Sequence, residues 1–211
     1  VPQSKVINMV GGDVTITDGH LYAPDGQVNV VSVASGGEVA LDPISMDFSQ
    51  FASLGTITVS NPSGSYPFVG FGPGSNIDVT STAWKDGVGG GRIVIRGGNF
   101  YLDNGSVRAD VIESINGGGI DIKVNGMVTM KNDGKLLAST YFSTGKAGNI
   151  TLEAGALLME NTATISNGSS GAGEGGIVSI TTESVTMKDG TFIVADATKS
   201  GNGGSVQLQT T

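Results

Sequence analysis

Cysteine is absent from this chain of 211 residues, which excludes disulfide frameworks, thiol chemistry and zinc–thiolate sites. Only one histidine is present, His20, so a metal site built from several histidines is excluded as well. No apolar run approaches the roughly 20 residues that a membrane-spanning helix needs. We therefore expect a chain that does not span a membrane and that is stabilised by a packed core.

Basic residues are also scarce, because 11 Lys and Arg stand against 19 Asp and Glu and give a formal net charge of −8. Nucleic acid and anionic membrane surfaces both require a basic footprint, so neither is expected as a partner. No G-x-S-x-G motif accompanies His20, and we interpret this histidine as a solvated turn residue rather than a catalytic base.

Glycine is abundant instead, with 35 residues in the chain. The stretch from Gly171 to Gly176 formally matches the G-x-G-x-x-G dinucleotide motif, but that motif must open a helix. A strand is predicted to follow at residues 177–180. We therefore interpret the stretch as a turn between strands and expect no nucleotide and no other cofactor.

A short alternating strand preceded by a glycine-rich turn recurs every 28 or 29 residues. Alternation places the side chains of a strand on opposite faces, so each unit has one apolar row that it cannot bury alone. Stacked coils with superposed apolar rows solve this problem. The aligned apolar positions are Ile93, Ile122, Ile150, Val178 and Val206.

Two further strands fit into each repeat, which predicts an all-β parallel β-helix, a solenoid with three strands per coil. The second strands end at Leu102, Met130, Met159 and Met187, and the third strands begin at Val107, Leu136, Ile165 and Ile193. A tight turn separates them, in which Asx and Gly residues supply the left-handed backbone. These turns are Asp103-Asn104-Gly105, Asn132-Asp133-Gly134, Asn161-Thr162-Ala163 and Lys188-Asp189-Gly190.

The N-terminal part repeats the same order of strands and turns once, over residues 14–33. Residues 40–90 are then predicted to form an irregular coil with an aromatic-rich insertion, with strands at 54–59 and 76–80. We interpret residues 1–211 as one β-helix domain that is a fragment of a longer protein. The aromatic residues gathered in this region are Phe48, Phe51, Tyr66, Phe68, Phe71 and Trp84.

Two interpretations of these aromatic rings remain open. The rings can cover a flank of the coil where the insertion folds back, or they can form a platform for a ligand. The candidate ligand-contact surface comprises Tyr66, Phe68, Phe71 and Trp84.

Acidic side chains offer two further sites. Arg108 and Asp110 on a third strand are the best pair for a polysaccharide-degrading enzyme, although a surface ion pair explains them without catalysis. The turn residues Asp18, Asn104, Asp133 and Asp189 offer oxygens to calcium, but the G-G-x-G-x-D repeat of calcium-binding rolls is absent. We therefore assign no catalytic, cofactor or metal residue, and leave calcium at the turns open.

The segment from Val10 to Gly37 (VGGDVTITDGHLYAPDGQVNVVSVASGG) and the later units Asp103-Asn104-Gly105-Ser106 and Asp189-Gly190-Thr191 resemble a known family. They are similar to the region that follows the secretion domain in filamentous haemagglutinin-like exoproteins of two-partner secretion systems. The resemblance implies a right-handed β-helix, exported by an outer-membrane transporter that recognises parts outside this chain. The Asn-Pro-Asn type of recognition motif is missing, and Asn61-Pro62-Ser63-Gly64 is only a degenerate version of it.

These observations predict a structural and adhesive shaft segment of a large secreted bacterial surface protein, without enzymatic activity. It would lie at the cell surface or outside the cell and present binding surfaces to a host-cell, matrix or polysaccharide receptor. Two alternatives remain: a carbohydrate-active β-helix enzyme, either a polysaccharide lyase or a hydrolase, and a roll stabilised by calcium.

Overall fold

The computed structural model describes residues 5–39, 48, 50–64, 68–69, 72–73, 76–81, 90–112, 114–142 and 144–211. These residues form strands and turns, and no helix occurs among them, which confirms the all-β prediction. Nothing in this part of the chain is therefore a helix long and apolar enough to cross a membrane.

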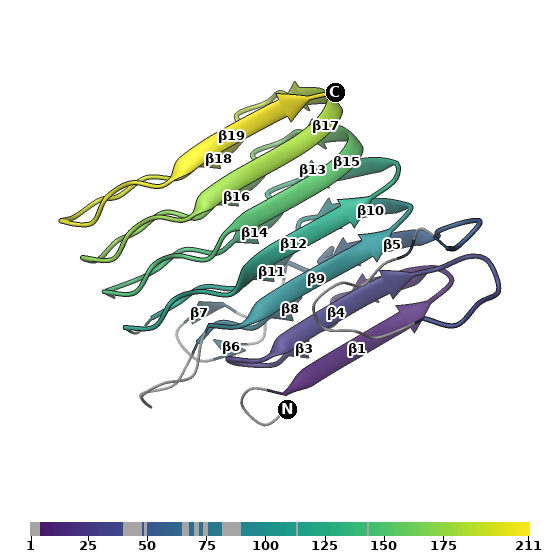
Figure 1. The fold of residues 1–211 in the computed structure, drawn as a ribbon, viewed down its shortest axis with the longest axis horizontal. Helices are drawn as coiled ribbons and strands as arrows, with labels where there is room; N and C mark the ends of the chain where they lie inside the picture. Colours follow the sequence, from purple (N-terminus) through teal and green to yellow (C-terminus); the bar gives the residue numbers. More distant parts are fainter. Residues whose placement is uncertain are drawn as a thin grey trace.

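Most strands lie in three stacks of parallel strands, and the first stack runs the length of the molecule (Figure 1). Every neighbouring pair in it is parallel. Its members are β1 (Val6–Gly11), β4 (Gln27–Ser32), β9 (Arg92–Gly97), β12 (Gly119–Val124), the first halves of β15 (Ile150–Met159) and β17 (Ile177–Met187), and β19 (Ser205–Thr210).

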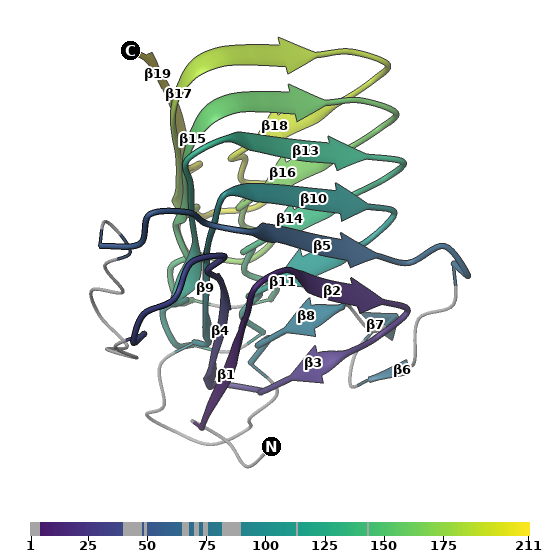
Figure 2. The same cartoon turned by 90° about the vertical axis from the view of Figure 1, so that its right-hand side faces the viewer.

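The second and third stacks are built in the same way, and Figure 2 shows them from the side. The second contains β2 (Val14–Thr17), β5 (Thr56–Ser60), β10 (Asn99–Asp103), β13 (Met127–Lys131) and the second halves of β15 and β17. The third contains β3 (Leu21–Tyr22), β8 (Ile77–Asp78), β11 (Ser106–Arg108), β14 (Lys135–Leu137), β16 (Thr164–Ser166) and β18 (Phe192–Val194). A short antiparallel pair, β6 (Phe68–Val69) and β7 (Gly72–Pro73), stands apart from the stacks.

The strands β15 and β17 each continue from the first stack into the second. Residues 150–153 of β15 pair with β12, and residues 156–159 pair with β13. The first and second stacks are consequently one sheet that bends at these strands.

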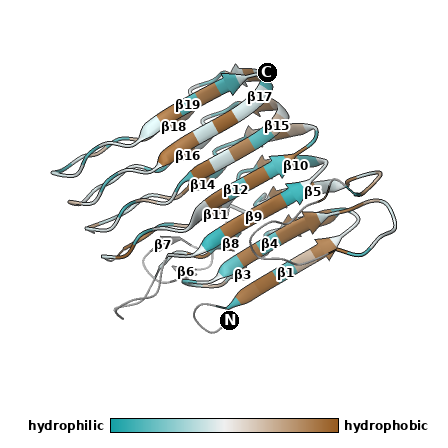
Figure 3. Ribbon diagram, in the orientation of Figure 1, coloured by the Kyte–Doolittle hydropathy of each residue, from teal (hydrophilic) through white to brown (hydrophobic). Residues whose placement is uncertain are grey.

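The core lies between the three stacks and consists of superposed aliphatic columns. Alternation within each strand sends every second side chain inward, and Figure 3 shows hydrophobic positions recurring from strand to strand. The column of the second stack is Ile16, Val59, Leu102, Met130 and Met159, and that of the third is Leu21, Ile77, Val107, Leu136 and Ile165.

The predicted register is confirmed in the second and third stacks, where Leu102, Met130, Met159 and Met187 are partners, as are Val107, Leu136, Ile165 and Ile193. In the first stack the alignment of Ile122 is wrong. Ile120 is the residue that pairs with Ile93 and Ile150, whereas Ile122 pairs with Ile95 and Leu152.

The coil from Ile93 to Ile120 is 27 residues long and the next, from Ile120 to Ile150, is 30, so the repeat length is not constant here. A shift of two residues returns a side chain to the same face of a strand. Ile122 is therefore still fully buried.

In the N-terminal region, the predicted strands at 54–59 and 76–80 correspond to β5 and β8. Together with β4 they occupy one position in each of the three stacks, although they are separated by longer connections than the later strands. Strand β1 was not predicted. It pairs with β4 along its whole length.

Candidate functional site

The candidate ligand-contact surface lies outside the described part of the chain. Tyr66, Phe71 and Trp84 are not among the described residues, and Phe68 is placed only as backbone in β6. A role of these four side chains in binding stays a prediction.

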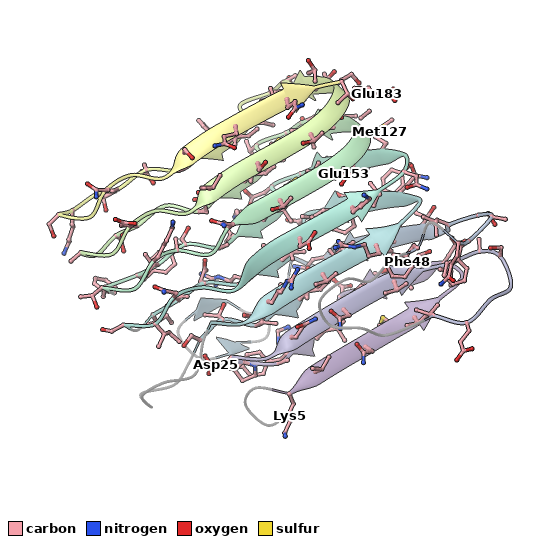
Figure 4. All side chains as sticks on the ribbon, viewed as in Figure 1. Lys5, Asp25, Phe48, Met127, Glu153 and Glu183 are labelled. Atoms are coloured by element: carbon pink, nitrogen blue, oxygen red, sulfur yellow. The ribbon has the colours of Figure 1, made fainter. Side chains whose placement is uncertain are left out.

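The neighbouring aromatic residues Phe48 and Phe51 are described, and they cover the outer face of the first stack. Their ring centroids lie 6.3 Å apart. Phe48, which is labelled in Figure 4, packs against Val31 and Val94 in a cluster separate from the main core. For these two rings the covering interpretation is confirmed.

The Arg108–Asp110 pair extends outward from the third stack, because Val107 and Ala109 take the inward positions. Arg108 Nε donates to Asp110 Oδ2 at 2.5 Å, and the Ser139 backbone N–H donates to Asp110 Oδ1 at 2.7 Å. The Asp110 side chain is 1% exposed and that of Arg108 is 24% exposed. The predicted surface ion pair is therefore wrong in one respect, since its carboxylate is buried.

A second carboxylate, Asp78, joins this pair. Asp78 in β8 is the neighbour of Arg108 in the backbone register of β8 and β11, is itself buried, and accepts a hydrogen bond from the Thr80 backbone N–H at 2.8 Å. The sequence reasoning missed Asp78. It follows Ile77 directly, so extending the third-strand alignment from Val107 back to Ile77 would have found it.

Electrostatics of this cluster favour a structural role. Burial raises the pKa of the Asp110 carboxyl, against the charge and hydrogen bond of Arg108 and the N–H of Ser139, which lower it. Burial likewise raises the pKa of the neighbouring Tyr141 hydroxyl, and the charge of Asp110 adds to this effect. A carboxylate that is enclosed and already accepts two hydrogen bonds fastens β11 to Ser139, which follows β14.

A third carboxylate, Asp121, lies on the outer face of the first stack. Its Oδ2 accepts hydrogen bonds from Arg92 Nη2 and Arg96 Nη2, both at 2.9 Å. Burial alone would raise the pKa of Asp121, but the hydrogen bonds and charges of the two arginines outweigh it, and the net pKa lies below the usual range. Farther along the face, Lys123 pairs with Glu153 at 2.9 Å. Asp121 and Glu153 therefore already have cationic partners.

His20 follows the Asp18-Gly19 turn, as predicted, but its ring is half-buried rather than fully solvated. It stacks on Tyr22 with ring centroids 5.6 Å apart. This contact gives the single histidine a packing role.

The Asx turns between the second and third stacks confirm the predicted turn chemistry. Asp18, Asn104, Asn161 and Asp189 have φ between 49° and 57°, in the left-handed region. The amides form a ladder along the stack, in which Asn161 Nδ2 donates to Asn132 Oδ1 at 3.1 Å and Asn132 Nδ2 donates to Asp103 Oδ1 at 2.7 Å.

This ladder disfavours calcium binding at the turns, because its hydrogen bonds already use side-chain oxygens that a bound cation would need. Within the described ranges, no group of three or more His, Asp and Glu side chains could hold a metal ion. Calcium binding at the turns stays a prediction.

The chain matches no family model, no curated protein and no solved structure. Evidence for its function therefore comes from the repeat pattern, the stacked strands and the sites described above.

Proposed function

We propose that the chain is a right-handed parallel β-helix, with three strands and about 28–29 residues per coil, and that it forms a shaft segment of a large secreted bacterial surface protein. The stacks of parallel strands support this arrangement, because each return to the first stack is a crossover between parallel strands. Such crossovers are right-handed in nearly all proteins. On this proposal the strands make six coils and the first strand of a seventh.

The observation that carries the proposal is the superposition of like positions along all three stacks. A solenoid built in this way grows by one strand spacing of about 4.8 Å per coil and depends only on neighbouring coils. Such a solenoid can hold a binding surface at a distance from the cell without a catalytic site. Its outer faces, where charged side chains largely pair with one another, are free to vary and to present binding surfaces.

The resemblance of the repeats to filamentous haemagglutinin-like exoproteins supports secretion by a two-partner system. The outer-membrane transporter would act on parts of the protein outside this chain, and the shaft would meet a host-cell, matrix or polysaccharide receptor. An antibody raised against residues 90–211 tests this proposal on whole cells and culture medium. We expect labelling outside the cell that disappears when the cognate transporter is deleted, and retention inside the wild-type cell would contradict secretion.

The alternative, a carbohydrate-active enzyme, requires Arg108 and Asp110 to meet a substrate. The burial of Asp110 and its two hydrogen bonds favour the shaft. Release of reducing sugar or of unsaturated uronate from acidic polysaccharides tests the alternative. Activity that is lost in Asp110→Asn and kept in the exposed-turn control Asp133→Asn would establish the enzyme.

A further inference from the structure

The connections from the third stack back to the first project from one side of the molecule, as Figure 1 shows on its left. Parallel bridges join Thr140, Ser169 and Ala197 in three successive connections and so fix their register. Two residues further along each connection, Phe142, Gly171 and Lys199 occupy equivalent positions.

A hollow of about 320 Å³ lies on these connections. Phe142 and Lys199 belong to the first and third connections, and Gly171 lies between them without a side chain to occupy the space. Each connection adds a hydroxyl-bearing residue to the lining, namely Thr144, Ser170 and Ser200. The size is at the lower end of the range for small-molecule sites, about 300–1,000 Å³.

Phe142 is unusual in two independent ways. Its side chain is 82% exposed, the largest exposure among the large hydrophobic residues of the described chain. Its φ of 55° lies in the left-handed region, where a bulky side chain is a genuine outlier. Core packing does not explain an exposed ring held in a strained conformation, and such strain tends to persist at functional sites.

Lys199 places a positive charge beside this ring. Its Nζ lies 5.8 Å from the centroid of Phe142, within the range of a cation–π contact. Lys199 makes no ion pair with any residue that the structure describes. Its charge is therefore available to an anionic ligand.

The polar groups of the hollow favour a sugar over a peptide. The backbone groups of the connections are used in pairing, because Thr140 N–H donates to Gly168 O, Ser169 N–H to Asp196 O, and Ser170 N–H to Thr140 O. In contrast, Thr144 and Ser200 are exposed residues of the lining. An aromatic face, hydroxyls that both donate and accept, and one ammonium group suit a hydroxylated ring that carries an acid.

We propose that this hollow binds a carboxylated sugar residue of an acidic polysaccharide. The apolar face of the sugar ring packs on Phe142, its carboxylate meets the Lys199 ammonium, and its hydroxyls reach Thr144 and Ser200. The biological role of this site, though not its chemistry, rests on the proposed function as a shaft that displays binding surfaces.

Calorimetric or NMR titration with a trimer of galacturonic acid tests the site, and galactotriose serves as the neutral counterpart without carboxylates. We expect the wild-type chain to bind the acidic trimer more tightly and to lose affinity as salt is raised. Lys199→Gln should weaken binding of the acidic trimer about tenfold and leave the neutral trimer unchanged, and Phe142→Ala should weaken binding of both at least tenfold.

Phe192→Ala and Lys123→Gln are matched controls, because these side chains are 58% and 54% exposed and lie outside the hollow. Both should bind like wild type. Absence of binding by the wild-type chain, equal losses in the controls, or equal affinity for the neutral trimer would overturn the proposal. Failure of the sugar-binding proposal would not change the result of the surface-labelling experiment. Conversely, retention of the protein inside the cell would contradict the proposed secreted shaft but would not change the binding measured by titration.

Discussion

At the scale of single residues, the tight turns show how local chemistry is reused along the stack. The pairs Asn132–Asp133, Asn161–Thr162 and Asp189–Gly190 occupy equivalent positions, and every residue in them has a positive φ. Asx and Gly adopt this conformation readily, whereas the β-branched Thr162, with a φ of 64°, does so only at a cost. The turn geometry is therefore imposed by the stack and not by Thr162.

This comparison predicts that Thr162→Gly stabilises the protein. The side chain is exposed, so its removal loses little packing, and relief of the left-handed strain should raise the free energy of unfolding by about 1 kcal/mol. Chemical denaturation measures the change. Thr164→Gly, in the neighbouring strand β16, is the control and should destabilise the protein, and a loss of stability in Thr162→Gly would contradict the argument.

A second residue-scale prediction concerns acid. The pKa of Asp121 lies below its unfolded value of about 3.9, so its contacts with Arg92 and Arg96 stabilise the fold fully above that pH. The stabilisation is lost as the pH falls through the folded-state pKa. Asp121→Asn should therefore lower the free energy of unfolding by about 1 kcal/mol at pH 7, and by less near pH 3.

Thermal unfolding at several pH values measures this difference. The exposed Asp133→Asn serves as a control with one lysine partner and should change stability less. A difference between Asp121→Asn and wild type that stays constant from pH 7 to pH 3 would show that the arginine contacts are not what stabilises the fold.

At the scale of elements, glycine permits the close approach of successive connections. An ideal Cβ on Gly145, Gly173 or Gly201 would lie 1.9 Å from a carbonyl oxygen of the preceding connection, that of Ile115, Gly145 or Gly173 respectively. Real Cβ atoms essentially never approach that closely. The abundance of glycine therefore reflects stacking of the connections as well as turn conformation.

Gly173→Ala should accordingly destabilise the protein by about 1–3 kcal/mol, as overpacking does elsewhere. Gly12→Ala is a matched control, because a Cβ there meets nothing within 4 Å and its backbone is not left-handed. Denaturation midpoints compare the two variants. Equal stability of Gly173→Ala and Gly12→Ala would contradict the close approach.

The alternation within strands gives a second prediction at this scale. Ile150 is fully buried and Thr151 beside it is exposed, so Ile150→Asp places an unpaired charge in the core. We expect Ile150→Asp to abolish cooperative unfolding, and Thr151→Asp to change the free energy of unfolding by less than about 0.5 kcal/mol. Circular dichroism during heating records both. A cooperative transition in Ile150→Asp would place Ile150 outside the core.

At the scale of the whole molecule, comparing the predicted strand register with the observed one shows how far the sequence repeat determines the stacking of the coils. The second and third stacks follow the sequence alignment residue by residue. In the first stack the alignment departs by two residues at Ile122, because the coil from Ile93 to Ile120 is shorter than the coil from Ile120 to Ile150. Repeat spacing predicts the stacks, whereas the length of each coil decides the register.

A prediction about calcium concerns the whole molecule, because a β-roll that binds calcium at its turns would be stabilised along its entire length. The amide and carboxylate oxygens of the turns are engaged with neighbouring side chains, as at Asn132 and Asp103. We expect the melting temperature to be the same with millimolar calcium and with chelator. A rise with calcium would favour the roll over a shaft that depends on packing alone.

The sequence by itself determined most of the strands, the Asx turns and which strand positions face inward, because each depends on spacing and backbone preference within a few residues. Tertiary structure decided the two-residue offset at Ile122, the burial of Asp110 beside Asp78, and the hollow between Phe142 and Lys199. These features depend on which residues of separate coils become neighbours. Backbone stacking fixes that relation, and no local pattern in the chain contains it.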